Sequence, residues 1–125
     1  MNEFGDIVFS YTRRQALEDG LQVDVSQVAG EAGIRFPVFL TRTAWDTYVE
    51  VPEGVTGQDE AGRLWDILWM LRCHIGRSNG AELAFQLYVR NDNRRPRLVT
   101  LKAVCGPRDI DDPQPAITIM MPDED

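Results

Sequence analysis

The sequence predicts an α+β fold in which a buried central helix packs on a C-terminal three-stranded antiparallel meander. The segment 59–75 carries apolar residues around most of its circumference, which is typical of a helix covered on more than one side. The three segments that follow alternate apolar and polar residues and are joined by turn-rich links, which is typical of antiparallel strands. A chain of 125 residues is long enough to bury one core, so we expect a single globular domain over residues 1–125.

Short helices and extended pieces are predicted before the central helix. Residues 11–20 indicate a helix, because Thr12 and Gln15 make a capping-box pattern and Gly20 stands where a C-terminal glycine belongs. The other N-terminal elements are an extended piece at 21–25, a helix capped by Ser26 that runs to Gly33, an extended segment at 36–40, and a helix from Thr41 or Thr43 to about Pro52.

The central helix is indicated by one continuous apolar stripe. Its members recur at i, i+4, i+7 and i+11, and they are Leu64, Leu68, Leu71 and Ile75. Trp65 and Trp69 run beside this stripe, and we expect both to lie in the core. Thr56 or Asp59 is expected to cap the start of the helix, and Gly76 to end it.

Three strands are predicted after the helix, at 81–90, 97–105 and 116–121. Cys73 in the helix and Cys105 in the second strand do not form a disulfide framework. We expect both to be small buried hydrophobic residues in a reducing cytoplasm.

Composition and charge exclude several classes of function. The net charge of −7 and the pI near 4.6 argue against direct binding of nucleic acid. No apolar run approaches the roughly 18 residues that a membrane span needs, and the N-terminus lacks the features of a signal peptide. We therefore expect a cytoplasmic protein without membrane contact.

Acidic side chains gather in one loop and at the C-terminal end, where a protein partner can reach them. The partner-binding residues that this predicts are Asp109, Asp111, Asp112, Asp123, Glu124 and Asp125. The loop lacks the central glycine and the distal glutamate of an EF-hand, so it does not indicate calcium. Two cysteines and one histidine without a characteristic spacing do not indicate zinc, and we expect no metal or other cofactor.

Two alternatives stay open. A small enzyme, or a protein that binds a nucleotide or phosphate ligand, could use a cleft lined by Tyr11, Arg13, Arg14 and Asp46, with His74 as a further candidate. No nucleotide-binding or hydrolase motif supports catalysis, so we expect no catalytic residue. The other alternative is a structural homo-oligomer, which an exposed apolar patch on the outer sheet face would support.

Three segments resemble one family. These are residues 11–20, 23–26 and 59–72, which occur in order and at fitting distances. The family comprises small proteins of unknown function encoded on bacterial plasmids, phages and integrated elements. The resemblance implies a setting, an accessory protein of a mobile element, and it implies no activity, cofactor or catalytic residue.

The hypothesis that combines these observations is a non-enzymatic protein that binds a host or element protein through its acidic surface. Its sharper form is an anti-defence inhibitor, in which acidic groups occupy the DNA-binding groove of a restriction or CRISPR effector.

Overall fold

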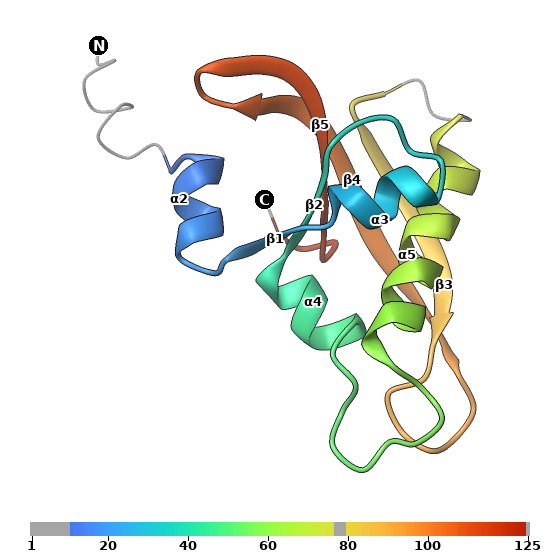
Figure 1. The fold of residues 1–125 in the computed structure, drawn as a ribbon. Helices are drawn as coiled ribbons and strands as arrows, with labels where there is room; N and C mark the ends of the chain where they lie inside the picture. The colour runs from blue at the N-terminus through green and yellow to red at the C-terminus, as the bar shows by residue number, and fades with distance from the viewer. Residues whose placement is uncertain (1–10, 77–79, 125) are drawn as a thin grey trace.

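The computed structural model describes residues 11–76 and 80–124, and it confirms the α+β class (Figure 1). Its elements in chain order are α2 (Arg13–Glu18), β1 (Gln22–Asp24), α3 (Ser26–Glu31), β2 (Val38–Thr41), α4 (Arg42–Tyr48), α5 (Glu60–Ile75), β3 (Glu82–Val89), β4 (Arg97–Asp109) and β5 (Asp112–Met120).

The sheet is larger than predicted. In the described part of the chain it has five strands in the order β1-β2-β5-β4-β3, and the predicted antiparallel meander is the β5-β4-β3 part. The prediction of three strands was wrong because β2 pairs in parallel with β5, and β1 pairs antiparallel with β2. Val38, Phe39 and Leu40 are all buried, so β2 has no alternation that would mark it as a strand of the same sheet.

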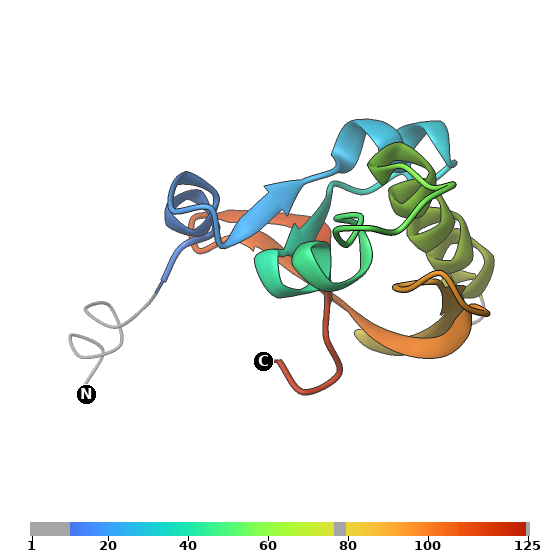
Figure 2. The same cartoon turned by 90° about the horizontal axis from the view of Figure 1, so that it is seen from below.

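The core lies between this sheet and α5. Figure 2 shows α3 and α5 on one side of the sheet, and α5 packs against both β3 and α3. The largest fully buried side chains come from the sheet and from one face of α5, and they include Phe39, Leu40, Ile67, Leu68, Leu71, Phe85, Leu101 and Ile119.

The expectation that Trp65 and Trp69 are core residues was wrong. Trp65 and Trp69 are 38% and 44% exposed, whereas Leu64 on the same helix is 7% exposed and Leu68 is fully buried. Each residue turns an α-helix by about 100°, so the tryptophans fall outside the arc that faces the sheet. The helix is covered on its sheet and α3 sides, and the tryptophan side faces solvent.

Both cysteines are exposed and free, so the expectation that they are buried was also wrong. Cys73 lies on the part of α5 that faces solvent, away from Leu71 and Leu68. Cys105 lies on β4 beyond the last residue that pairs with β3, where the sheet begins to leave the cover of α5.

Capping explains where most helices begin. Thr12 and Gln15 form the predicted capping box of α2, Thr41 caps α4, and the side chain of Asp59 accepts a 2.7 Å hydrogen bond from the Gly62 N–H of α5. The prediction that Ser26 caps α3 was wrong. Its hydroxyl instead bonds with the backbone of Val38, which ties α3 to the start of β2.

Strands β4 and β5 run past the rest of the sheet as a two-stranded arm, residues 106–115. β3 pairs with β4 only as far as Val104, and β2 pairs with β5 only from Ile117 onward. Figure 1 shows the arm curving away from the sheet toward α2. The strand predictions at 97–105 and 116–121 missed this extension because Pro107 and Pro115, which face each other across it, interrupt the alternation.

Candidate functional site

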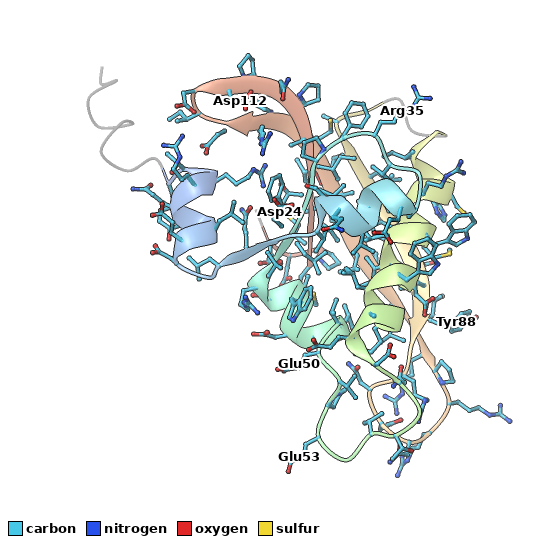
Figure 3. The ribbon with its side chains drawn as sticks, in the orientation of Figure 1. Asp24, Arg35, Glu50, Glu53, Tyr88 and Asp112 are labelled. Atoms are coloured by element: carbon cyan, nitrogen blue, oxygen red, sulfur yellow. The ribbon has the colours of Figure 1, made fainter. Side chains whose placement is uncertain are left out.

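The predicted acidic loop is the tip of the arm. Asp109 ends β4 and Asp112 begins β5, so the predicted acidic loop is the turn of a β-hairpin. Figure 3 labels Asp112 on this projecting arm and Asp24 below it, at the end of β1.

Asp109 joins the arm to α2. Its Oδ1 accepts hydrogen bonds from the N–H groups of Arg13 (3.1 Å) and Ile110 (2.8 Å), and its Oδ2 accepts one from the N–H of Arg14 (3.0 Å). Thr12 accepts from the next N–H of the helix, that of Gln15. The free N–H groups at the start of α2 are therefore satisfied, two of them by a residue about a hundred positions away in the chain.

The environment of Asp109 lowers its pKa below the ordinary aspartate value. Partial burial alone would raise the pKa, but the hydrogen bonds from the N–H groups of Ile110, Arg14 and Arg13 outweigh it, and the positive charge of Arg14 adds to them. Asp109 is thus held as a carboxylate whose oxygens are already engaged.

Arg13 holds α2 to the sheet. Its guanidinium carbon lies 4.1 Å from the centre of the Phe39 ring, and its Nη1 donates to Gln22 (2.7 Å) and to Thr118 (3.1 Å). Its Nε donates to the carbonyl of Arg108 on the arm. Burial lowers the pKa of Arg13, and the charge of Asp109 offsets part of this effect.

A hollow of about 770 Å³ lies between α2 and the arm. Tyr11 and Arg13 line it from one side, and Asp109, Asp111 and Asp112 line it from the other. The structure therefore brings two residues of the predicted enzyme cleft together with the predicted acidic patch. Because three carboxylates share this hollow with Arg13 and Arg108, it is not a strongly positive site.

The tip itself presents an apolar side chain between acidic ones. Ile110 is 66% exposed. Asp111 forms a 3.7 Å ion pair with Arg14 in which both side chains are largely exposed, and Asp112 accepts a 3.0 Å hydrogen bond from the N–H of Gln114. Asp111 and Asp112 thus keep free acceptor capacity, unlike Asp109.

The acidic tail divides in the same way. Asp123 is exposed, but Glu124 is partly buried, and its carboxylate accepts hydrogen bonds from Thr41 (2.8 Å) and from the N–H of Met121 (2.7 Å). Glu124 therefore fastens the chain end to α4 and β5. Asp125 lies outside the described residues.

The other predicted enzyme residues lie elsewhere or are already bonded. Asp46 forms an i,i+4 ion pair with Arg42 at 3.7 Å, and neither residue lines the hollow. Tyr11 donates a hydrogen bond to Asp19, which raises the pKa of the phenol. Nδ1 of His74 lies 2.8 Å from the carbonyl of Met70 within α5.

Sequence reasoning missed Ile110 and the role of Asp109. A lone apolar residue inside an acidic turn is the signal that could have identified Ile110, since such a residue has no core to enter. No local pattern could indicate that Asp109 caps α2, because the contact joins residues far apart in the chain.

Within 11–76 and 80–124, no three His, Cys, Asp or Glu side chains gather closely enough to hold a metal ion. None of the helices placed in that part of the chain combines the length and the apolar character that crossing a membrane requires.

Comparison with known proteins gives a family and no activity. No curated protein and no solved structure is significantly similar to the chain. One family matches along the whole length, residues 1–125, and its description is that of a family of unknown function. This agrees with the resemblance seen in the sequence, without showing a plasmid or phage setting, and the chain belongs to the DUF6573 family.

Proposed function

We propose that this protein is a non-enzymatic binding protein that engages a protein partner through the tip of the arm. The observation that carries the proposal is Ile110, an exposed apolar side chain between acidic residues on a projecting hairpin. Interfaces commonly combine a central apolar anchor with a polar rim that fixes orientation. The matching partner has an apolar socket bordered by basic side chains.

The arm is also held firmly enough to present such a surface. Asp109 and Arg13 attach it to α2, and Arg13 in turn rests on Phe39 in the sheet. A tip that is ordered before binding loses less conformational entropy when a partner immobilises it. In this proposal Asp109 positions the tip, while Ile110, Asp111 and Asp112 contact the partner.

The setting is part of the proposal and rests on the family resemblance. We propose an accessory protein of a mobile element that acts inside a bacterium on a host or element protein. Basic, groove-shaped surfaces are typical of proteins that bind DNA, so a nucleic-acid-binding defence effector is the partner class that suits an acidic tip best.

The test is capture of partners from a bacterial lysate by the immobilised chain, with washes at about 50 mM and about 500 mM salt and identification by mass spectrometry. The variant Asp111→Asn/Asp112→Asn should lose the captured partner, and Ile110→Ser should lose it with all charges kept. The matched control is Glu50→Gln/Glu53→Gln, which removes the same charge far from the arm (Figure 3). Equal capture by all variants, or equal loss in the control, contradicts the proposal.

A second candidate, self-association, is favoured by a different observation. Tyr88 and Leu98 are directly opposite each other on β3 and β4, and they are 68% and 51% exposed. Such a pair on the outer sheet face can join two copies. Light scattering across a range of concentrations tests it: a dimer that Tyr88→Ser/Leu98→Ser converts to a monomer supports self-association, and a monomer throughout refutes it.

A further inference from the structure

The solvent side of α5 carries a column of flat groups. The rings of Trp65 and Trp69 are stacked, with centres 6.2 Å apart and planes 12° apart. The guanidinium of Arg72 lies over Trp69, with its carbon 5.6 Å from the ring centre. This face already holds one guanidinium on an indole, so its geometry suits cation–π contact.

Trp65 lines a hollow of about 670 Å³ at the start of the helix. The other lining residues are Gly57, Gln58, Asp59, Gly62, Arg63 and Asp66. Helical side chains lean toward the N-terminus of their helix, which places Trp65 over the turn that contains Gly62. A side chain at position 62 would crowd the cap of the helix, because a Cβ there would lie 3.0 Å from Oδ1 of Asp59.

Arg63 also lines this hollow, but its guanidinium is held by neutral acceptors. Its guanidinium donates to the carbonyls of Val49 (3.1 Å) and Arg90 (2.8 Å) and to the side chain of Asn91 (2.6 Å). It also donates to the side chain of Gln58 at 3.3 Å. Arg63 is therefore occupied by neutral acceptors, and it forms no ion pair with the carboxylate of Asp66.

The carboxylate of Asp66 also lines the hollow. Its side chain makes no hydrogen bond or ion pair with the part of the chain that the structure describes. Asp66 is exposed, and partial burial raises the pKa of its carboxyl group. A cation that enters the hollow would supply the missing partner.

We propose that this hollow binds the side chain of an arginine from a basic segment of a protein partner, with the guanidinium stacked on Trp65 and hydrogen-bonded to Asp66. A guanidinium is planar, it stacks on aromatic faces, and it donates two parallel hydrogen bonds to a carboxylate. The net charge of −7 attracts a basic segment over a longer range.

This surface is distinct from the arm. α5 lies at the opposite end of the molecule from α2 and the arm tip (Figures 1 and 2). The inference does not depend on the proposed function, and either can fail while the other stands.

The experiment is titration of ¹⁵N-labelled protein with a hexa-arginine peptide, followed by the three tryptophan indole N–H signals and the backbone amides. We expect shifts at the Trp65 indole and the Gly62 amide, and none at Trp45, which lies on α4. Hexa-lysine should bind more weakly, because an ammonium does not stack as a plane. Hexa-glutamate should not bind.

The variant Asp66→Asn should weaken hexa-arginine binding by roughly fivefold or more relative to its matched control. That control is Glu60→Gln, which removes the same charge from the first turn of α5 but does not line the hollow. Trp65→Leu should weaken binding to a similar degree, whereas Trp65→Phe should retain part of it.

Three results would overturn the inference: equal weakening by Asp66→Asn and Glu60→Gln, peptide-induced shifts confined to the arm, or no shift at Trp65 at millimolar peptide. Urea unfolding of each variant separates binding from folding, because Asp66→Asn is expected to fold at least as stably as the natural sequence.

Discussion

Two ends of the molecule each contain an arginine and a neighbouring aspartate, but they use the aspartate in opposite ways. At the arm, Asp109 is fully engaged by N–H groups of α2, and Arg13 bonds beside it. At the start of α5, Arg63 bonds neutral oxygens, and the side chain of Asp66 has no hydrogen bond or ion pair with residues 11–76 or 80–124. The Asp109 carboxylate holds the arm to α2, whereas the Asp66 carboxylate is available to a ligand.

The two arginines also differ in what they hold together. Arg63 is 6% exposed and joins the end of α4 to the turn after β3, both of which border the core. Arg13 is only partly buried and attaches α2, which lies outside the core, to the arm. Loss of Arg63 should therefore weaken the whole fold, and loss of contacts at the arm should act locally.

The largest expected effect is that of Arg63→Met, which keeps the aliphatic stem and removes the donors. Buried acceptors such as the Val49 carbonyl and the Asn91 side chain would lose a charged partner, so the free energy of unfolding should fall by about 2–4 kcal/mol. Urea unfolding measures this. The control Arg72→Met, on the exposed side of the same helix, should cost less than about 1 kcal/mol; equal losses would contradict the role assigned to Arg63.

The next effect compares two glycines with left-handed backbone, one at each end. Gly33 has a φ of +98° and its Cβ would lie 2.9 Å from Nε of Arg72, whereas Gly20 has a φ of +75° and open space. Gly33→Ala should therefore cost roughly 2–3 kcal/mol, from strain plus displacement of Arg72, and Gly20→Ala about 1 kcal/mol from strain. Thermal unfolding of both variants checks the order, and a greater loss at Gly20 would refute it.

A smaller, local effect is expected at the arm. Asp109→Asn replaces one acceptor oxygen by an NH₂ group that faces an N–H of α2, which should cost about 1 kcal/mol. Hydrogen exchange should speed up in α2 and stay unchanged in β3. The control is Asp123→Asn at the exposed chain end. Faster exchange throughout the sheet would show that the arm is part of the cooperative core instead.

The pH dependence of the arm follows from the lowered pKa of Asp109. The unfolded state binds more protons than the folded state once the pH falls below the ordinary aspartate value of about 3.9. The contribution of Asp109 is therefore complete above that pH and is lost as the pH falls through the lowered pKa. NMR signals of the α2 amides, recorded from about pH 5 downward, should change with Asp109 protonation and should not do so in Asp109→Asn.

Local chemistry was predictable: the Thr12 capping box and the antiparallel strands β3 to β5 follow from spacing alone and are confirmed. Trp65 and Trp69 were misassigned because an apolar pattern counts residues around a helix and does not show how many neighbours cover it. Here α5 is covered by the sheet and α3, and the remaining face is free.

The candidate sites depended on contacts that no window of sequence contains. The sequence showed the acidic cluster at Asp109, Asp111 and Asp112. It did not show that Asp109 has a structural role that the other two lack, because Asp109 bonds to a helix near the other end of the chain. In the same way, Asp66 is distinctive only because Arg63 is bound by Arg90 and Asn91, about 27 residues later.

The smallest expected effect is that of Asp66→Asn. The stability contribution of Asp66 also depends on pH in the opposite direction to that of Asp109. Because burial raises the pKa of Asp66, the folded state binds more protons than the unfolded state in the range between the ordinary and the raised pKa. The contribution of Asp66 to stability should therefore improve as the pH falls through the raised pKa, the reverse of Asp109.

At neutral pH, Asp66→Asn should leave the free energy of unfolding unchanged or raise it by no more than about 0.5 kcal/mol. Urea unfolding at pH 7 measures this, with Glu60→Gln as the control for net charge. A clear loss of stability in Asp66→Asn would mean that Asp66 serves the fold. No loss is the result expected if Asp66 serves binding instead.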